Sequence, residues 1–143
     1  MSDLDELYQA VIVDHDRAPR RHGPLLGATH GATADNPLCG DVVTLHLCLE
    51  DGVIRDVSFE GRGCSVSRAA ASILSTMLAG TDLAAARALS AAFEAFVHSA
   101  PDAPAAPELG DLAAFAGVRR FRSRRACATL PLRALAAALA PER

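Results

Sequence analysis

The amino-acid sequence predicts an α+β domain, with a small antiparallel sheet of two or three strands and helices packed on one of its faces. Residues 43–50 and 53–61 alternate apolar and polar side chains and flank Asp51-Gly52, which is a strong hairpin signal. One helical pattern precedes this hairpin and several follow it, so strands and helices are segregated along the chain. Because the chain has 143 residues, we expect residues 1–143 to form a single domain.

Before the hairpin, apolar residues recur at helical spacing in residues 4–16, which predicts an amphipathic helix. Pro19 ends this helix, because the residue before a proline is pushed out of the helical conformation. Residues 18–35 are rich in Gly, Pro, Ala and Thr and should form a loop, with a weak edge strand near residues 28–34. In the first hairpin strand, the side chains expected to share one face are Val43, Leu45, Leu47 and Leu49.

The hairpin is followed by patterns that are typical of helices. Ser65 or Ser67 should cap the first of them, which stops at Gly80. Thr81 and Ser90 should then each cap a further short helix, because hydroxyl side chains accept hydrogen bonds from the first free N–H groups of a helix.

Proline interrupts the helical patterns in the last third of the chain. Residues 99–108 are too rich in proline for regular structure and should form an exposed linker, with a short helix at residues 109–115. Thr129 should cap a final helix with Pro131 in its first turn, where proline is tolerated. The arginine-rich run at residues 119–125 is expected to be a solvated loop.

Composition and charge exclude several classes of function. The formal net charge of -3 gives no reason to expect nucleic-acid binding, and the arginine run contains a single aromatic residue, Phe121. The acidic N-terminus does not resemble a secretory signal, and no apolar run approaches the roughly 20 residues that span a bilayer. We therefore expect a cytoplasmic protein without a membrane partner, in which spaced cysteines indicate metal binding or catalysis rather than disulfides.

Three cysteines and one aspartate are candidate metal ligands. Cys39 and Asp41 lie two residues apart on a turn before the first hairpin strand, and strand pairing should bring Cys64 close to Cys39. Cys64 and Cys127 each precede a helical pattern, where the helix dipole and free N–H groups favour a thiolate. Three thiols and a carboxylate suit Zn²⁺, but thiolates also suit an iron–sulfur cluster, so ligand type leaves the metal open.

Three further residues have less specific interpretations. Arg124 and Arg125 add positive charge beside Cys127, which predicts thiolate stabilisation, and the arginine run is a candidate docking surface for an acidic partner. Cys48 lies within a strand and is interpreted as a small buried hydrophobic residue.

Five motifs occur in order and cover nearly the whole chain: residues 11–15 with Pro19-Arg20, 36–41, 59–67, 109–112 and 127–130. They resemble the SufU branch of the IscU/NifU-N-like family of iron–sulfur cluster assembly proteins. The Cys39-Gly40-Asp41 and Gly63-Cys64-Ser65 elements are together highly specific. The segment around residues 98–120 is longer than in the IscU scaffolds, and Ala126 stands where the scaffolds have histidine. Both features favour the SufU branch.

This resemblance implies an IscU/SufU-like fold in which Cys39, Asp41, Cys64 and Cys127 bind one Zn²⁺. The implied function is that of a zinc-dependent sulfurtransferase. A SufS-type cysteine desulfurase makes a persulfide from cysteine, Cys39 accepts its terminal sulfur while a partner histidine replaces Cys39 on the zinc, and the sulfur passes to a downstream iron–sulfur assembly scaffold. Two alternatives stay open: a scaffold that holds a [2Fe–2S] cluster on the same ligands, and a zinc-stabilised interaction domain without sulfur chemistry.

The chain departs from the SufU pattern ahead of its last cysteine. SufU proteins usually have Phe-Pro-Ala-Arg where this chain has Phe121-Arg122-Ser123-Arg124, and a basic residue where this chain has Ala126. Arg124 keeps the arginine of the family, and Arg125 is placed to supply the charge missing at Ala126. These differences bear on desulfurase docking and leave the metal ligands unchanged.

Overall fold

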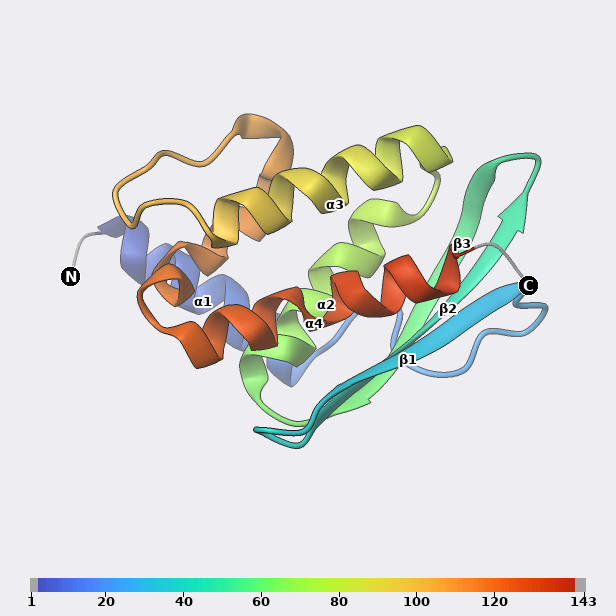
Figure 1. The fold of residues 1–143 in the computed structure, drawn as a ribbon, viewed down its shortest axis with the longest axis horizontal. Helices are drawn as coiled ribbons and strands as arrows, with labels where there is room; N and C mark the ends of the chain where they lie inside the picture. Colours follow the sequence, from blue (N-terminus) through green and yellow to red (C-terminus); the bar gives the residue numbers. More distant parts are fainter. Residues whose placement is uncertain (1–2, 141–143) are drawn as a thin grey trace.

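The computed structural model describes residues 3–140. Three strands form an antiparallel sheet in the order β1-β2-β3, and the helices pack on one of its faces (Figure 1). This arrangement confirms the predicted α+β class. The elements follow one another as α1 (Asp3–Arg17), β1 (His30–Asn36), β2 (Asp41–Glu50), β3 (Val53–Arg62), α2 (Ser65–Leu78), α3 (Leu83–Val97), the 3₁₀ helix η1 (Pro107–Arg120) and α4 (Arg122–Ala138).

The β2–β3 hairpin fixes which chain ends meet at the edge of the sheet. Asp51 and Gly52 have φ values of 52° and 74°, the left-handed conformations that a tight two-residue hairpin turn requires. With this turn the register pairs Val42 with Arg62 at the far end of the hairpin. The segment before β2 and the segment after β3 therefore lie side by side, as the sequence predicts.

The core lies between the sheet and the helices. Val43, Leu45 and Leu47 of β2 are fully or almost fully buried, which confirms their predicted common face, and Phe59 of β3 is buried as well. Leu49 is only half-buried, because a register shift between Cys48 and Leu49 interrupts the alternation. In Figure 1, α4 runs along β1 and β2, and α2 lies over β3.

The prediction of two short helices after Gly80 is wrong. One continuous helix, α3, spans this segment, and Ser90 lies in its interior. Its N-cap is Asp82, whose carboxylate accepts a hydrogen bond from the Ala85 N–H at 2.7 Å. The segment is rich in alanine and leucine, and their high helix propensity outweighs the weaker preference of a serine for a cap position.

The prediction for the start of the last helix is also wrong. α4 begins at Arg122 after the N-cap Phe121, so Pro131 lies inside the helix and Thr129 is not a cap. The Thr129 hydroxyl instead donates to the Arg125 carbonyl at 3.0 Å. Residues 122–125 therefore form the first turn of a helix and not a solvated loop.

A buried arginine organises the segment predicted to be an exposed linker. Residues 99–106 are irregular, as expected, but the Arg119 side chain is only 7% exposed and donates to groups of this segment. Its guanidinium also lies 4.5 Å from the Phe96 ring centroid. The acceptors are the Ser99 hydroxyl and the carbonyls of Ala100, Pro101, Ala103 and Ala116, all at 2.8–3.0 Å.

A second polar contact fastens α1 to α2. His15 Nδ1 lies 2.7 Å from the Ser72 hydroxyl, which also accepts a hydrogen bond from the Arg20 N–H at 2.8 Å. His15 is buried, and this burial, with the positive charge of Arg20, lowers its pKa. His15 therefore has a structural role.

Among residues 3–140, no helix combines the length and the apolar character needed to cross a membrane.

Replacing Arg119 should destabilise the fold strongly. We expect Arg119→Met to lower the free energy of unfolding by about 2–3 kcal/mol, because several partly buried hydrogen bonds between the 99–106 segment and η1 are lost together. Urea unfolding monitored by circular dichroism measures the change. The matched control is Arg120→Met at the exposed neighbouring position, which should change stability by less than about 0.5 kcal/mol. Equal effects of the two substitutions would contradict the role assigned to Arg119.

Candidate metal centre

Asp41 is the buried acidic group of the site. It is the first residue of β2 and only 1% exposed. One carboxylate oxygen accepts the Cys64 N–H at 2.9 Å, and the other lies 3.1 Å from the Cys64 thiol. Burial opposes ionisation, but the hydrogen bonds from Cys64 and the nearby thiols of Cys127 and Cys39 outweigh it and lower the pKa of Asp41. The carboxylate is therefore a preformed negative charge at the end of the sheet.

Cys39 is presented to solvent by a tight turn between β1 and β2. The Asn36 carbonyl accepts hydrogen bonds from the N–H groups of Cys39 at 3.2 Å and Gly40 at 2.8 Å. Gly40 has a φ of 75°, a left-handed conformation that glycine adopts without strain. Cys39 is exposed, whereas Cys127 and Asp41 are buried and Cys64 is half-buried. Among these candidate ligands, Cys39 is the most accessible thiol.

Cys64 stands at a helix N-terminus, as predicted. It is itself the N-cap of α2, which starts at Ser65, so neither Ser65 nor Ser67 is the cap residue. The predicted serine cap is therefore wrong. The Ser67 hydroxyl donates to the Cys64 carbonyl at 3.2 Å. The position of Cys64 directs its backbone N–H at Asp41, and this links the end of the sheet to the start of α2.

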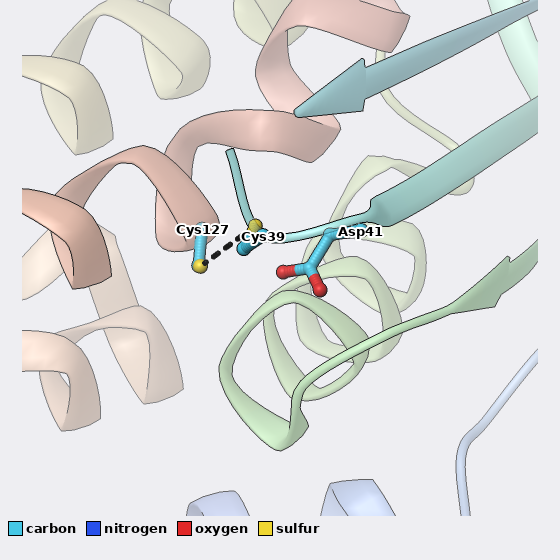
Figure 2. Close-up of side chains that lie close together, drawn as sticks. All are labelled: Cys39, Asp41 and Cys127. Atoms are coloured by element: carbon cyan, nitrogen blue, oxygen red, sulfur yellow. Dashed lines mark hydrogen bonds between the residues drawn. The ribbon is translucent and has the colours of Figure 1, made fainter. Parts of the chain in front are cut away.

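Cys127 does not stand at a helix N-terminus, and this prediction is wrong because α4 starts five residues earlier, at Arg122. Cys127 projects from α4 toward the turn that carries Cys39 (Figure 2). Burial raises the pKa of its thiol most, and the hydrogen bond to the neighbouring Asp41 carboxylate raises it further. In the protein without a metal, the thiol of Cys127 is therefore held in its neutral form.

Three of the four candidate ligands form one cluster, and the fourth, Cys64, contacts this cluster at Asp41. The sulfur atoms of Cys39 and Cys127 are 3.8 Å apart, and the ligand atoms of Cys39, Asp41 and Cys127 lie within 4.8 Å of one another. Cys64 joins this group through the Asp41 carboxylate. In a tetrahedral site with zinc–sulfur bonds of about 2.3 Å, two sulfur ligands are about 3.8 Å apart. The spacing and the donor types therefore fit a zinc ion.

Gly63 is a residue of the site that sequence reasoning missed. Its φ is 131°, and a Cβ at this position would overlap the Asp41 carboxylate. Only glycine permits so close an approach of the chain to the aspartate. The available signal was its place directly before Cys64 in a Gly-Arg-Gly-Cys sequence, which is typical of a backbone that comes close to another group.

Arg124 and Arg125 lie on the first turn of α4, but their side chains make contacts other than with a thiol. The Arg125 guanidinium donates to the Arg119 carbonyl at 2.7 Å. The Arg124 guanidinium lies 5.3 Å from the ring centroid of Phe121. These contacts hold the start of α4, while a direct role of either arginine at a thiolate or a partner stays a prediction.

Comparison with known proteins identifies relatives along almost the whole chain. The family described as the NifU-like N terminal domain matches residues 7–128. The SufU of Bacillus subtilis, named a zinc-dependent sulfurtransferase, is 36% identical and covers 99% of this chain and 95% of its own. The IscU of Streptococcus pyogenes, named an iron–sulfur cluster assembly scaffold protein, is 37% identical, and the match covers 97% of this chain and 86% of the relative.

The fold also matches solved structures. A crystal structure from Fervidobacterium islandicum, described as a putative iron–sulfur cluster assembly scaffold protein for the SUF system, superposes with a TM-score of 0.83. It is 27% identical to this chain, and the match covers 91% of this chain and 94% of the other. A NifU-like protein from Brucella abortus, also 27% identical, gives a TM-score of 0.82 over 96% and 95% of the two chains.

Substituting Gly63 should weaken metal binding. We expect Gly63→Ala to reduce zinc affinity by roughly tenfold or more, because the added methyl group displaces Asp41. Substitutions of groups that hold metal ligands in place typically lower metal affinity by this amount. Competition with a chromophoric chelator measures the affinity. The control is Gly117→Ala, because a Cβ there meets open space. The same zinc affinity in both variants would contradict the role of Gly63.

Proposed function

The chain belongs to the NifU-like N-terminal domain family, which includes SufU and IscU proteins, and on this premise we propose that it is a zinc-dependent sulfur-relay protein of iron–sulfur cluster assembly. The observation that supports this proposal best is the accessibility of Cys39. One thiol of a clustered set of candidate metal ligands is exposed, while the carboxylate and another thiol are buried.

Cys39, Asp41, Cys64 and Cys127 are the residues that hold the zinc ion in this proposal. Three thiols and one carboxylate form a donor set that Zn²⁺ accepts in tetrahedral geometry. Bound zinc keeps these thiols deprotonated at neutral pH, which offsets the burial that raises the pKa of Cys127. Asp41 contributes negative charge and keeps Cys64 in place through its backbone hydrogen bond.

The sulfur transfer itself is a thiol–persulfide exchange. The Cys39 thiolate attacks the terminal sulfur of a persulfide on a SufS-type cysteine desulfurase. The sulfur–sulfur bond of that persulfide breaks, the desulfurase cysteine leaves as a thiolate, and Cys39 carries the new persulfide. No external oxidant or reductant is consumed. A second exchange of the same kind passes the sulfur to a downstream iron–sulfur assembly scaffold.

The second candidate function is that of a scaffold that holds a [2Fe–2S] cluster on the same ligands. The thiol-rich donor set supports it, because cysteine thiolates are the usual ligands of iron–sulfur clusters. The similarity to an IscU scaffold protein supports it as well. Ala126 favours the relay, because the residue before Cys127 provides no imidazole that could serve as a further cluster ligand.

Substituting Cys39 tests the relay. Cys39→Ala should abolish the stimulation of a cysteine desulfurase, measured as alanine formed from cysteine, while circular dichroism shows a retained fold. The control is Cys48→Ala, which removes a thiol that lies on a strand outside the site and should leave stimulation unchanged. Full stimulation by the Cys39→Ala protein would exclude the relay and favour an interaction domain without sulfur chemistry.

Removing the metal should lower stability. We expect a chelator to reduce the melting temperature of the purified protein, because the ligands connect the hairpin ends to α2 and α4. At a free metal concentration a hundredfold above its Kd, a bound ion raises the free energy of unfolding by about 2.7 kcal/mol. Differential scanning calorimetry measures the shift. Cys64→Ala, which lacks one ligand, should respond much less. An unchanged melting temperature of the wild-type protein would exclude a structural contribution from the metal.

A further inference from the structure

A hollow of about 840 Å³ opens directly beside Cys39. The turn with Asn36, Leu38 and Cys39 forms one wall, and residues 120–126 form most of the other. Leu38 is 96% exposed and Phe121 is 53% exposed. These two large apolar side chains both line what we name the Cys39 hollow, so it offers apolar contact area next to the exposed thiol.

The Cys39 hollow is also positively charged. Arg120 and Arg122 line it and are exposed, and no Asp or Glu is among the residues that line it. Elsewhere on the surface, Arg20 and Arg21 form salt bridges with Asp14 and Asp56. Within residues 3–140, neither Arg120 nor Arg122 has a salt-bridge partner. No carboxylate of the described residues therefore forms a salt bridge with either guanidinium, and Asp5 and Asp102 line a separate hollow that Arg120 also borders.

The wall that carries Arg120 and Arg122, here called the arginine wall, is held in place before any partner binds. Buried Arg119 fastens the end of η1 to the 99–106 segment. The Arg119 carbonyl accepts the Arg125 guanidinium at 2.7 Å, and the Phe121 N–H donates to the Val118 carbonyl at 3.0 Å. Because these contacts fix the backbone on both sides of Arg120, binding at this wall loses little backbone conformational entropy.

We propose that the Cys39 hollow is the docking site for a segment of the sulfur-donating desulfurase that carries an acidic side chain beside an apolar one. The inference rests on the proposed function and specifies which surface chemistry the partner presents. The apolar side chain packs between Leu38 and Phe121. The carboxylate pairs with Arg120 and Arg122, whose planar guanidinium groups bind carboxylates with two parallel hydrogen bonds.

A protein segment fits this surface better than a nucleic acid does. The apolar contact area includes Leu38, which cannot stack on a base as an aromatic side chain can. The whole chain has a net charge of -3, so positive charge is confined locally. Docking at the hollow brings the partner to Cys39, because Cys39 is part of its wall. Binding of the acidic segment and delivery of the sulfur are thereby coupled in space.

The test is the affinity of zinc-loaded protein for a SufS-type desulfurase at low and at physiological salt. The double variant Arg120→Glu with Arg122→Glu should bind roughly tenfold or more weakly, mainly through a slower on-rate, and should lose most of the salt dependence. The charge-matched control is Arg55→Glu with Arg87→Glu, two exposed positions outside the hollow, and it should bind like the wild type. Leu38→Ala should weaken binding without changing the salt dependence.

The outcomes separate this inference from the proposed function. If the wild-type protein binds and stimulates the desulfurase but both double variants behave alike, the docking inference is overturned and the relay stands. If the wild-type protein neither binds nor stimulates the desulfurase, both fail. Sedimentation of the same proteins tests whether a second copy of this chain occupies the hollow instead. If only the Arg120→Glu, Arg122→Glu variant loses self-association while its desulfurase affinity is unchanged, the hollow joins two copies and the inference is overturned.

Discussion

The hydrogen bonds between Asp41 and Cys64 are the contacts on which the rest of the site depends. They connect the first residue of β2 to the N-cap of α2, at the end of the sheet where the hairpin strands meet. A carboxylate buried to this degree is costly unless its charge is compensated by hydrogen bonds or a cation. The hydrogen bond from the Cys64 N–H compensates part of this charge, and Gly63 leaves the space that lets the backbone come so close to the Asp41 carboxylate. The thiols around Asp41 complete a donor set that a divalent cation would neutralise.

The candidate ligands differ in their exposure to solvent. Asp41 at the start of β2 and Cys127 within α4 are buried, so regular secondary structure holds both of them in place. Cys39 stands on a turn at the surface and borders the hollow formed by Leu38, Phe121 and the arginine wall. A thiol that is both part of a metal-ligand cluster and open to a partner suits a protein that receives sulfur and passes it on. The buried Arg119 network connects the end of η1 to the 99–106 segment and to Arg125, and thereby holds the backbone next to Arg120 in place.

That the segment with Cys39 and Asp41 meets the segment with Cys64 could be predicted from the sequence, because Asp51-Gly52 and the strand alternation determine the hairpin register. The position of Cys127 within α4 could not. Thr129 and Pro131 resemble a helix start, but the helix begins at Arg122 and incorporates the proline, as the burial of α4 against the sheet outweighs these local signals. The roles of Arg119 and Gly63 depend on contacts with distant segments, so neither composition nor periodicity indicates them.

The most direct test of the account is the metal and acid-labile sulfide content of the protein purified without added iron. The account predicts about one zinc ion per chain and no sulfide, as expected for a closed four-ligand thiolate–carboxylate site. Iron together with a matching amount of sulfide, in a coloured protein, would contradict the relay. The same thiols would then be ligands of an iron–sulfur cluster.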